Sequence, residues 1–419
     1  MSLLWPGEER ARDLFSDAAF LAAMVRVEEA WLAAIVSSGI APEEARTPLA
    51  GLVSADDVPG LATSTEAGGN PVIALVKLLR GRLEGEAARW LHKGLTSQDV
   101  VDTAVVLCLA DVLDRVEEEL AAQASSLVGL ARKHRATVMS GRTLTQHAVP
   151  TTFGLKAATW LSGLTDAAEV LRRTRTSLPA QVGGAAGTLA AVVGLARLRG
   201  RNDPVAAAET AAATTATVLG LAQRPPWHTI RAPLTGAADA LVTAADTWGR
   251  IATDITLLAR PEIGELAEPA GEGRGGSSTM PHKSNPVLSV LVRRHALSAP
   301  PLGATLHTAA ASYVDERPDG AWHAEWETLQ TLARRSVVAA SQTTELLGGL
   351  RVDAARMRAT AEAAGADLLA EQRSLTDFVG GDVLTGSDSA AGVGDYLGAN
   401  DALIDTTISR AHEVWKDLP

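Results

Sequence analysis

Residues 98–135 read QDVVDTAVVLCLADVLDRVEEELAAQASSLVGLARKHR, and this stretch decides the fold class. It contains no proline and only one glycine, so almost nothing in it interrupts a helix. We therefore predict a single helix of roughly 35 residues, about three times the usual length of ~11–12. Helices of this length pack side by side as a bundle.

The rest of the chain shows the same helical pattern, with apolar residues at every third or fourth position. Ser16 is a predicted N-cap, Asn70-Pro71 and Pro150 are predicted to open helices, and Gly39 is a predicted stop. The predicted helices cover residues 20–38, 72–83, 151–178, 208–221, 237–258, 286–295 and 396–415. Alternating strand patterns with Asn-Gly or Asp-Gly turns are essentially missing, so the sequence predicts an all-α protein.

Two shifts in composition, near residues 88–96 and 348–352, predict three domains. These are an N-terminal helical domain (1–95), a central long-helix bundle (96–347) and a short C-terminal helical domain (348–419). The last contains a segment rich in Gly, Ser and Asp at residues 373–395. A long-helix bundle has more apolar surface than one chain covers, which predicts a homo-oligomer.

The composition is that of a globular protein with a sizeable core, since 46% of the residues are hydrophobic and 21% are charged. The net charge of -11 argues against a nucleic-acid partner. The charged N-terminus lacks the apolar core of a signal peptide, and the most apolar segment, 183–198, is too short and glycine-rich to span a membrane. A cytoplasmic protein is therefore expected. The one cysteine, Cys108, excludes a disulfide within the chain and is predicted to be a small buried hydrophobic residue.

Residues 269–286 form the segment that is richest in chemistry. Closely spaced glycines, the composition expected of a mobile lid, lead into GSSTMPHKSNP at residues 276–286. Pro286 is predicted to start a helix, whose unpaired N–H groups beside Lys283 and Asn285 would form an anion site. By itself the pattern also fits a glycine-rich surface loop.

This eleven-residue segment resembles the signature of the fumarase/aspartase superfamily, which includes adenylosuccinate lyase, argininosuccinate lyase, aspartase and carboxymuconate cycloisomerase. The resemblance implies an all-helical, three-domain lyase without a cofactor. It also implies that Ser277 is the base that removes a proton from the carbon beside a carboxylate. Lys283 and Asn285 would then bind that carboxylate and the aci-carboxylate that it becomes, while His282 is expected to be structural.

The chemistry explains why the family needs these residue types. A proton alpha to a carboxylate is only weakly acidic, so preorganised donors must meet the second negative charge of the intermediate. A serine hydroxyl is also a poor base in water. It becomes usable when a closed loop excludes solvent and surrounds the alkoxide with N–H groups and positive charge.

Three further blocks resemble the same family, in the same order along the chain. TSQD at residues 96–99 also reads as a helix capping box, but the resemblance implies that the hydroxyls of Thr96 and Ser97 bind substrate. The other two blocks are GRTLTQHAVP at 141–150 and QVGGAAGT at 181–188. The remaining candidates are His147 for catalysis and Arg142, Thr143, Gln181 and Arg293 for substrate binding. Taken alone, His147 reads as structural, and each arginine reads equally well as a structural contact.

Two departures from the family pattern narrow the function. Most of these lyases have a histidine where this chain has Leu144, and a glutamate where it has Val290. The carboxymuconate cycloisomerase branch lacks the same pair. The expected reaction is therefore the interconversion of 3-carboxy-cis,cis-muconate and 4-carboxymuconolactone, in protocatechuate catabolism. An internal carboxylate, with a pKa near about 4, adds or departs without help from an acid.

The resemblance also implies a homotetramer whose active sites combine residues of three subunits, with a small polycarboxylate as substrate. No metal or cofactor is expected, since the nine histidines show no metal-binding spacing and no cofactor loop occurs. Three alternatives stay open. The first is another lyase of this branch that acts on a different dicarboxylate by β-elimination, for instance with a small nitrogen leaving group. The second is adenylosuccinate lyase. The third is a non-catalytic structural homologue.

Overall fold

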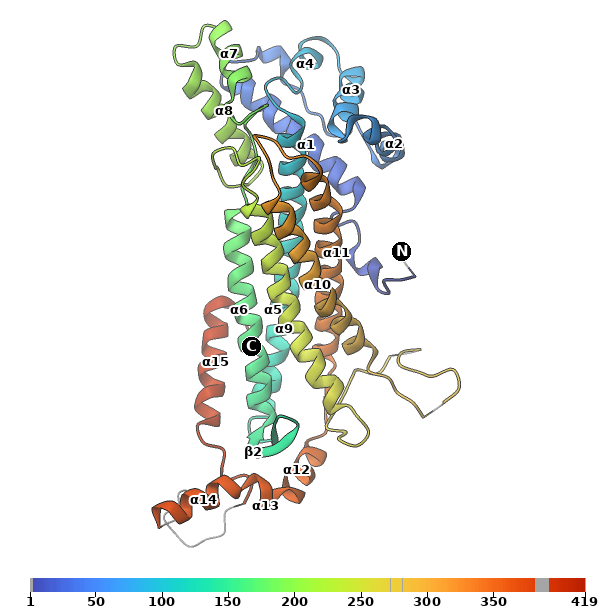
Figure 1. The fold of residues 1–419 in the computed structure, drawn as a ribbon, viewed down its shortest axis with the longest axis vertical. Helices are drawn as coiled ribbons and strands as arrows, with labels where there is room; N and C mark the ends of the chain where they lie inside the picture. Colours follow the sequence, from blue (N-terminus) through green and yellow to red (C-terminus); the bar gives the residue numbers. More distant parts are fainter. Residues whose placement is uncertain (1–2, 272, 281, 381–391, 419) are drawn as a thin grey trace. The chain divides into compact units, whose positions relative to one another are not determined.

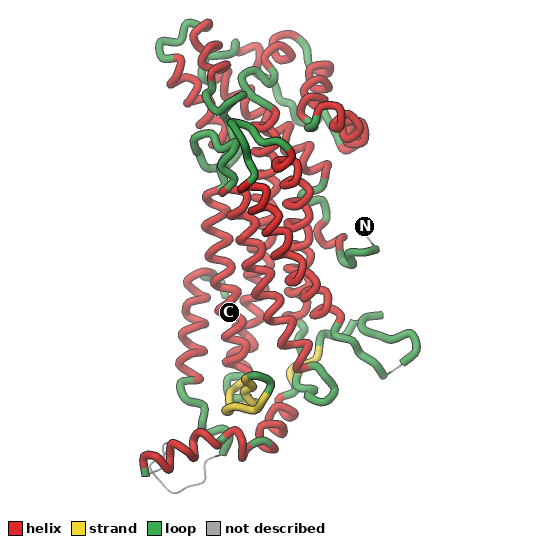
Figure 2. The backbone as a smooth tube through the Cα atoms, viewed as in Figure 1, coloured by secondary structure: helices red, strands yellow, loops and turns green. Residues whose placement is uncertain are grey.

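The computed structural model describes residues 3–271, 273–280, 282–380 and 392–418, and helices dominate these residues (Figure 1, Figure 2). The chain divides into two compact units. Unit 1 comprises Met1–Arg115, Leu171–Val242 and Ala299–Val338, and unit 2 comprises Val116–Val170, Thr243–Ser298 and Ala339–Pro419. The all-α fold class is confirmed, whereas the division into three domains stays a prediction.

The α-helices, in chain order, are α1 (Asp17–Ser37), α2 (Val58–Gly68), α3 (Val72–Arg82), α4 (Gly85–Trp90), α5 (Ser97–Lys133), α6 (Phe153–Ser177), α7 (Ala190–Leu198), α8 (Pro204–Val218), α9 (Ala232–Leu258), α10 (Val287–Ala311), α11 (Gly320–Gly348), α12 (Ala354–Ala363), α13 (Gly365–Leu368), α14 (Ala370–Val379) and α15 (Asn400–Val414). Short 3₁₀ helices cover Glu8–Ala11, Glu43–Ala45 and Ala55–Asp57. The strands of the described residues form two antiparallel pairs, β1 (Val138–Thr143) with β2 (Gln146–Thr152) and β3 (Leu266–Ala267) with β4 (Arg351–Val352). None of the described helices combines the length and the apolar character that are needed to cross a membrane.

Several helices begin where local sequence signals predict. The Ser16 hydroxyl accepts the N–H of Ala19 at 3.1 Å and so caps α1. At the start of α3, the side-chain oxygen of Asn70 accepts the N–H of Val72 at 3.1 Å. The long helix predicted from residue 98 is α5, which has 37 residues. These predictions are confirmed because each depends on residues that are neighbours in the chain.

In unit 1, α1, α7 and α8 pack around one apolar core. Trp31 and Ile35 of α1, Val192 of α7 and Ala211 of α8 are completely buried in it. The indole N–H of Trp31 donates to the backbone oxygen of Lys93 at 2.7 Å. This core therefore anchors the segment that leads into the start of α5.

In unit 2, buried polar side chains join the long helices to one another. Gln123 of α5 donates to the backbone oxygen of Ala340 of α11 and accepts from Trp248 of α9, both at 2.9 Å. Trp160 of α6 donates to Asp254 of α9, also at 2.9 Å. Because a buried polar group without a partner is costly, these pairs fix how the helices face each other. The predicted bundle is confirmed in this unit.

The prediction that strands are missing is wrong at residues 138–152, where β1 and β2 form a hairpin. Thr143 lies opposite Gln146, with Leu144 and Thr145 between them. These two turn residues have φ angles of 50° and 73°, as a two-residue hairpin turn with positive φ at both positions requires. Glycine and asparagine normally occupy such positions, so the sequence carries no signal for this turn.

Two predicted helix boundaries are wrong as well. Pro150 lies in β2 opposite Ser140, and α6 begins only at Phe153. The helix predicted to end at residue 295 is α10, which continues through Pro300 and Pro301. Because a proline inside a helix removes one backbone hydrogen bond, it usually indicates a helix end, but α10 continues past both prolines.

The C-terminal part departs from the prediction in a smaller way. The final helix, predicted from residue 396, begins at Asn400 as α15. The segment 373–395 contains most of α14, and its residues 381–391 lie outside the described part of the chain.

Candidate active site

Ser277 lies half-buried in the loop between β3 and α10, and two backbone N–H groups point at its hydroxyl. The Ser277 Oγ accepts from the N–H of Met280 at 3.2 Å and from that of Thr279 at 3.4 Å. Because two N–H groups donate to this oxygen, its negatively charged form is more stable than the alkoxide of a free serine. The local backbone therefore supplies part of what a serine alkoxide needs.

The two ends of this loop are joined at Gly275 and Asn285. The backbone N–H and the side-chain amide of Asn285 both donate to the Gly275 oxygen, at 2.8 and 2.9 Å. Gly275 has a φ of 73°, and a Cβ at this position would lie only 2.6 Å from the backbone oxygen of Asn285. In this structure the amide of Asn285 closes the loop, and its role toward substrate stays a prediction.

Replacing Gly275 by alanine is expected to lower kcat/KM at least about tenfold with little change in Tm. The added Cβ does not fit against Asn285, so the loop that presents Ser277 must open. Steady-state kinetics and thermal unfolding of the purified variant measure the two effects. Gly276→Ala is the matched control, because a Cβ at Gly276 meets no heavy atom within 4 Å. Equal losses of activity in the two variants would contradict this role for Gly275.

The anion site predicted at the start of α10 is occupied by a residue of the chain itself. Glu268 is 9% exposed, and its carboxylate accepts the N–H groups of Leu288 and Ser289 at 3.0 and 2.6 Å. It therefore takes the donors and the positive dipole end that were expected to meet the substrate. This part of the prediction is wrong. A substrate carboxylate must be met by other groups, such as Lys283, which is exposed on the loop.

The β1–β2 hairpin carries three of the predicted site residues. Arg142 makes two hydrogen bonds, at 3.1 and 2.7 Å, to the completely buried carboxylate of Glu265. His147 lies opposite Arg142, and its Nδ1 is 2.6 Å from the Ser140 hydroxyl. Thr143 is exposed beside the turn. Arg142, which was predicted to bind substrate, thus has a structural partner. His147 is exposed, and its Nε2 has no partner among the described residues.

The two positions that depart from the family pattern are both apolar and open to solvent. Leu144 is 96% exposed at the tip of the hairpin, and Val290 is 51% exposed on α10. Neither side chain can carry a proton. The left-handed backbone at Leu144 costs about 1–3 kcal/mol, a strain that tends to be found at functional sites.

Unit 2 places the predicted residues on two distinct elements, the loop and the hairpin. Within the described ranges, no hydrogen bond or ion pair joins Ser277 or Lys283 to the hairpin. His282 is exposed on the loop, and Arg293 is half-buried on α10.

In unit 1, the start of α5 carries the other predicted substrate-binding residues. The N–H of Thr96 donates to the Asp99 carboxylate at 2.9 Å, which is one half of the predicted capping box. The Thr96 hydroxyl accepts from Arg317 at 2.7 Å, and Ser97 is the first residue of α5. Arg317 is exposed and brings a positive charge to the turn of Thr96 and Ser97. It is absent from the predicted site residues.

Gln181 is completely buried and its side chain is used inside the chain. Its side-chain oxygen accepts the N–H of Trp227 at 2.7 Å, and its amide donates to Asp99 at 3.2 Å. Its backbone N–H and oxygen both bond to the Thr103 hydroxyl, at 2.9 and 3.0 Å. The polar groups of Gln181 thus have partners within the chain, and its contact with substrate stays a prediction.

One turn further along α5, a buried ion cluster surrounds Arg231. Its guanidinium bonds to Asp102 at 2.6 and 3.0 Å and to Glu325 at 2.6 Å, and the indole of Trp322 donates to Asp102 at 2.8 Å. Burial alone would lower the pKa of Arg231, but the two carboxylates raise it above its usual value. Burial raises the pKa of Glu325. The cluster thus holds one permanent cation between two carboxylates.

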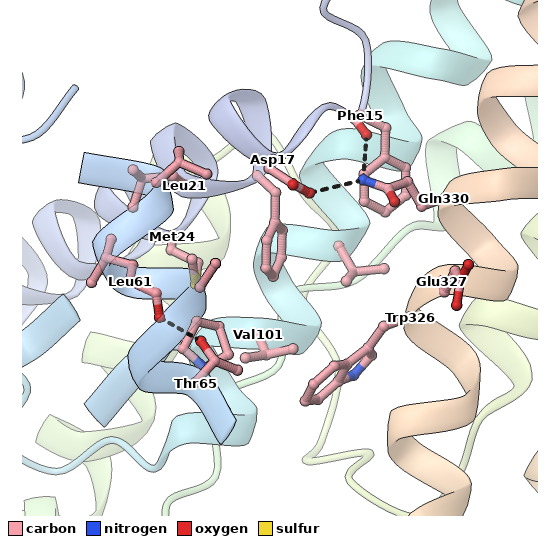
Figure 3. Close-up of a pocket in the computed structure, with 15 residues that line it drawn as sticks. Phe15, Asp17, Leu21, Met24, Leu61, Thr65, Val101, Trp326, Glu327 and Gln330 are labelled. Atoms are coloured by element: carbon pink, nitrogen blue, oxygen red, sulfur yellow. Dashed lines mark hydrogen bonds between the residues drawn. The ribbon is translucent and has the colours of Figure 1, made fainter. Parts of the chain in front are cut away.

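A separate apolar pocket of about 310 Å³ lies in unit 1 (Figure 3). Leu21, Met24 and Val101 face it, and its charged lining residues are the acids Asp17 and Glu327. None of the described residues that line it is a lysine or an arginine. A polycarboxylate would be repelled there, so this pocket is not the candidate active site.

Sequence reasoning missed Asp102, Arg231 and Arg317 as residues that build this region, and predicted Asp99 only as part of a helix capping box. The spacing of Asp99 and Asp102 puts both carboxylates on one face of α5, which is the only local signal. His228 lies 129 positions from Asp99 and Arg231 lies 129 positions from Asp102, so the sequence gives no indication of these two pairings.

A family of proteins described as lyases matches residues 54–299, more than half of the chain. The chain belongs to this family, the fumarase/aspartase superfamily, and is an enzyme of it.

Among its relatives, nitrosuccinate lyase of Streptomyces davaonensis is 44% identical over 87% of this chain and 78% of its own. The 3-carboxy-cis,cis-muconate cycloisomerase of Bradyrhizobium diazoefficiens is 41% identical over 85% of this chain and 77% of its own. The crystal structure of the 3-carboxy-cis,cis-muconate lactonizing enzyme from Pseudomonas putida superposes with a TM-score of 0.84 at 33% identity, and covers 96% of this chain and 97% of that one.

Proposed function

We propose that this enzyme interconverts 3-carboxy-cis,cis-muconate and 4-carboxymuconolactone. The observation that carries the proposal is the apolar pair Leu144 and Val290, at the positions where most of these lyases have a histidine and a glutamate. With neither group able to give or take a proton, a good leaving group is required. The internal carboxylate of a lactone is such a group, because it departs as a weak base.

Each candidate residue has its own role in this reaction. One carboxylate of the substrate adds across the conjugated double bond, and negative charge builds up on the neighbouring carboxylate. Lys283, Thr96 and Ser97 bind this aci-carboxylate, and Ser277 delivers the proton to carbon. In the reverse direction the Ser277 alkoxide removes that proton, supported by the N–H groups of Thr279 and Met280.

We propose that the working enzyme is a homotetramer in which the hairpin and the loop serve active sites shared between chains. The support is the exposure of Leu144, which is 96% open at a strained turn. An exposed apolar side chain held in a strained conformation fits a surface that another chain covers.

A second candidate is β-elimination from a dicarboxylate that carries a small nitrogen leaving group. It is favoured by the 44% identity to nitrosuccinate lyase. A nitro group leaves as nitrite, which is a weak base like a carboxylate, so the same apolar pair suits both reactions. Adenylosuccinate lyase fits less well, because an amine is a poorer leaving group that needs an acid.

Turnover by the purified enzyme distinguishes these functions. We expect loss of the ultraviolet absorbance of 3-carboxymuconate, no nitrite release from nitrosuccinate and no reaction with adenylosuccinate. Turnover of nitrosuccinate alone would establish the second candidate in place of the first. Absence of any turnover would favour the non-catalytic homologue.

A further inference from the structure

Asp99 is a completely buried carboxylate that gathers donors from three segments of unit 1. It accepts the backbone N–H groups of Thr96, Gly183 and Gly184, each at 2.9 Å. The ring Nε2 of His228 lies 3.0 Å from the same carboxylate. Since a carboxylate only accepts, this contact is a hydrogen bond in the tautomer that carries the proton on Nε2 of His228.

The backbone at Gly183 and Gly184 packs so closely around this carboxylate that neither position accepts a side chain without strain. A Cβ on Gly183 would lie 2.6 Å from the ring of His228, and Gly184 has a φ of 73°. Three backbone N–H groups on one buried carboxylate form a rigid junction, because moving any of them leaves a buried charge without its donor. A helix cap alone would use only the bond to Thr96.

We propose that Asp99, oriented by His228, is a positioning residue for substrate binding. It joins the turn of Thr96 and Ser97 to the loop of Gly183 and Gly184, and so fixes the direction in which the two hydroxyls face the substrate. This inference rests on the proposed function in one respect, the assignment of these hydroxyls to substrate binding.

The kinetic test compares Asp99→Asn with Thr103→Val in the full-length enzyme, using whichever substrate the wild type converts. In Asp99→Asn one carboxylate oxygen becomes an NH₂ group, which cannot accept from backbone N–H groups. We expect KM to rise at least about tenfold, the effect of losing about one hydrogen bond to a bound anion, and kcat to stay within about threefold. Thr103→Val breaks two equally buried bonds to the Gln181 backbone and removes none of the three backbone N–H groups that donate to Asp99, so its KM should stay near that of the wild type. Equal KM values in the two variants, or a loss confined to kcat, would overturn the proposal.

Hydrogen exchange supplies a readout that needs no substrate. Peptides that cover residues 95–99 and 183–185 should exchange at least about tenfold faster in Asp99→Asn than in the wild type, and at the wild-type rate in Thr103→Val. Unchanged exchange in Asp99→Asn would refute the junction. If the wild type converts none of the substrates above, the proposed function fails, whereas the exchange result still decides whether Asp99 holds these amides.

Two variants of His228 keep the proposal testable if Asp99→Asn does not fold. His228→Gln retains a donor for Asp99, and His228→Leu does not. We expect KM to stay within about twofold of the wild type in His228→Gln and to rise at least about tenfold in His228→Leu. The same KM in both would contradict a role for His228 in orienting Asp99.

Discussion

Replacing Ser277 by alanine is expected to lower kcat/KM by about 10³-fold, the loss that follows when a positioned general base is removed. The N–H groups of Thr279 and Met280 would then face a methyl group, which has no oxygen to accept their hydrogen bonds or to carry the negative charge. Because Ser277 is half-exposed on a loop, the variant should keep its Tm. Initial rates over a range of substrate concentrations measure the loss.

Ser278→Ala is the control for this substitution. Ser278 is the next residue, is exposed, and has no hydrogen bond among the described residues. Its kcat/KM should stay within about tenfold of the wild type, well above that of Ser277→Ala. If Ser277→Ala retained full activity, or if both variants lost activity equally, Ser277 would not be the base.

Replacing Arg231 by methionine is expected to lower the free energy of unfolding by about 3–5 kcal/mol. Asp102 and Glu325 are each 1% exposed and would both lose the guanidinium with which they form ion pairs. A buried carboxylate that loses its cation is costly, because a neutral donor such as the Trp322 indole beside Asp102 does not offset the charge. Urea unfolding at a fixed protein concentration measures the change.

Two comparisons make this second test specific. Arg175→Met breaks the ion pair with Asp114, whose side chains are 31% and 54% exposed, and should cost no more than about 1 kcal/mol. Adding Glu325→Gln to Arg231→Met removes one of the two stranded charges, so it should restore part of the lost stability. If Arg231→Met were no more costly than Arg175→Met, the cluster would not stabilise the fold.

Most of the helices could be predicted from the sequence because their determinants are local. Ser16 caps α1 three residues from its partner, and α5 is long because its residues contain no proline. The hairpin could not be predicted for the opposite reason. Its turn is formed by Leu144 and Thr145, residues that normally avoid positive φ, and the conformation is imposed by the surrounding structure.

The sequence predicted which segments form the candidate site, but not which side chains pair with one another there. The loop with Ser277 and the turn with Thr96 were found from their motifs. The partner of Arg142 is Glu265, 123 positions away, and no sequence pattern indicates that the two side chains meet. Glu268 likewise takes the start of α10 from a position outside the motif. Long-range ion pairs of this kind decide which charged residues stay available to a substrate.

The junction of Gly275 and Asn285 has a consequence for the entropy of binding. A loop that closes over a ligand loses conformational freedom, and the loss grows with the length of chain that must become ordered. Here the two hydrogen bonds from Asn285 to the Gly275 oxygen already join the two ends of the loop in the folded chain, so ordering these ends costs no further entropy when a ligand binds. This part of the loss is therefore incurred when the chain folds, and a small polycarboxylate, which makes few contacts, uses less of its binding free energy to order the protein.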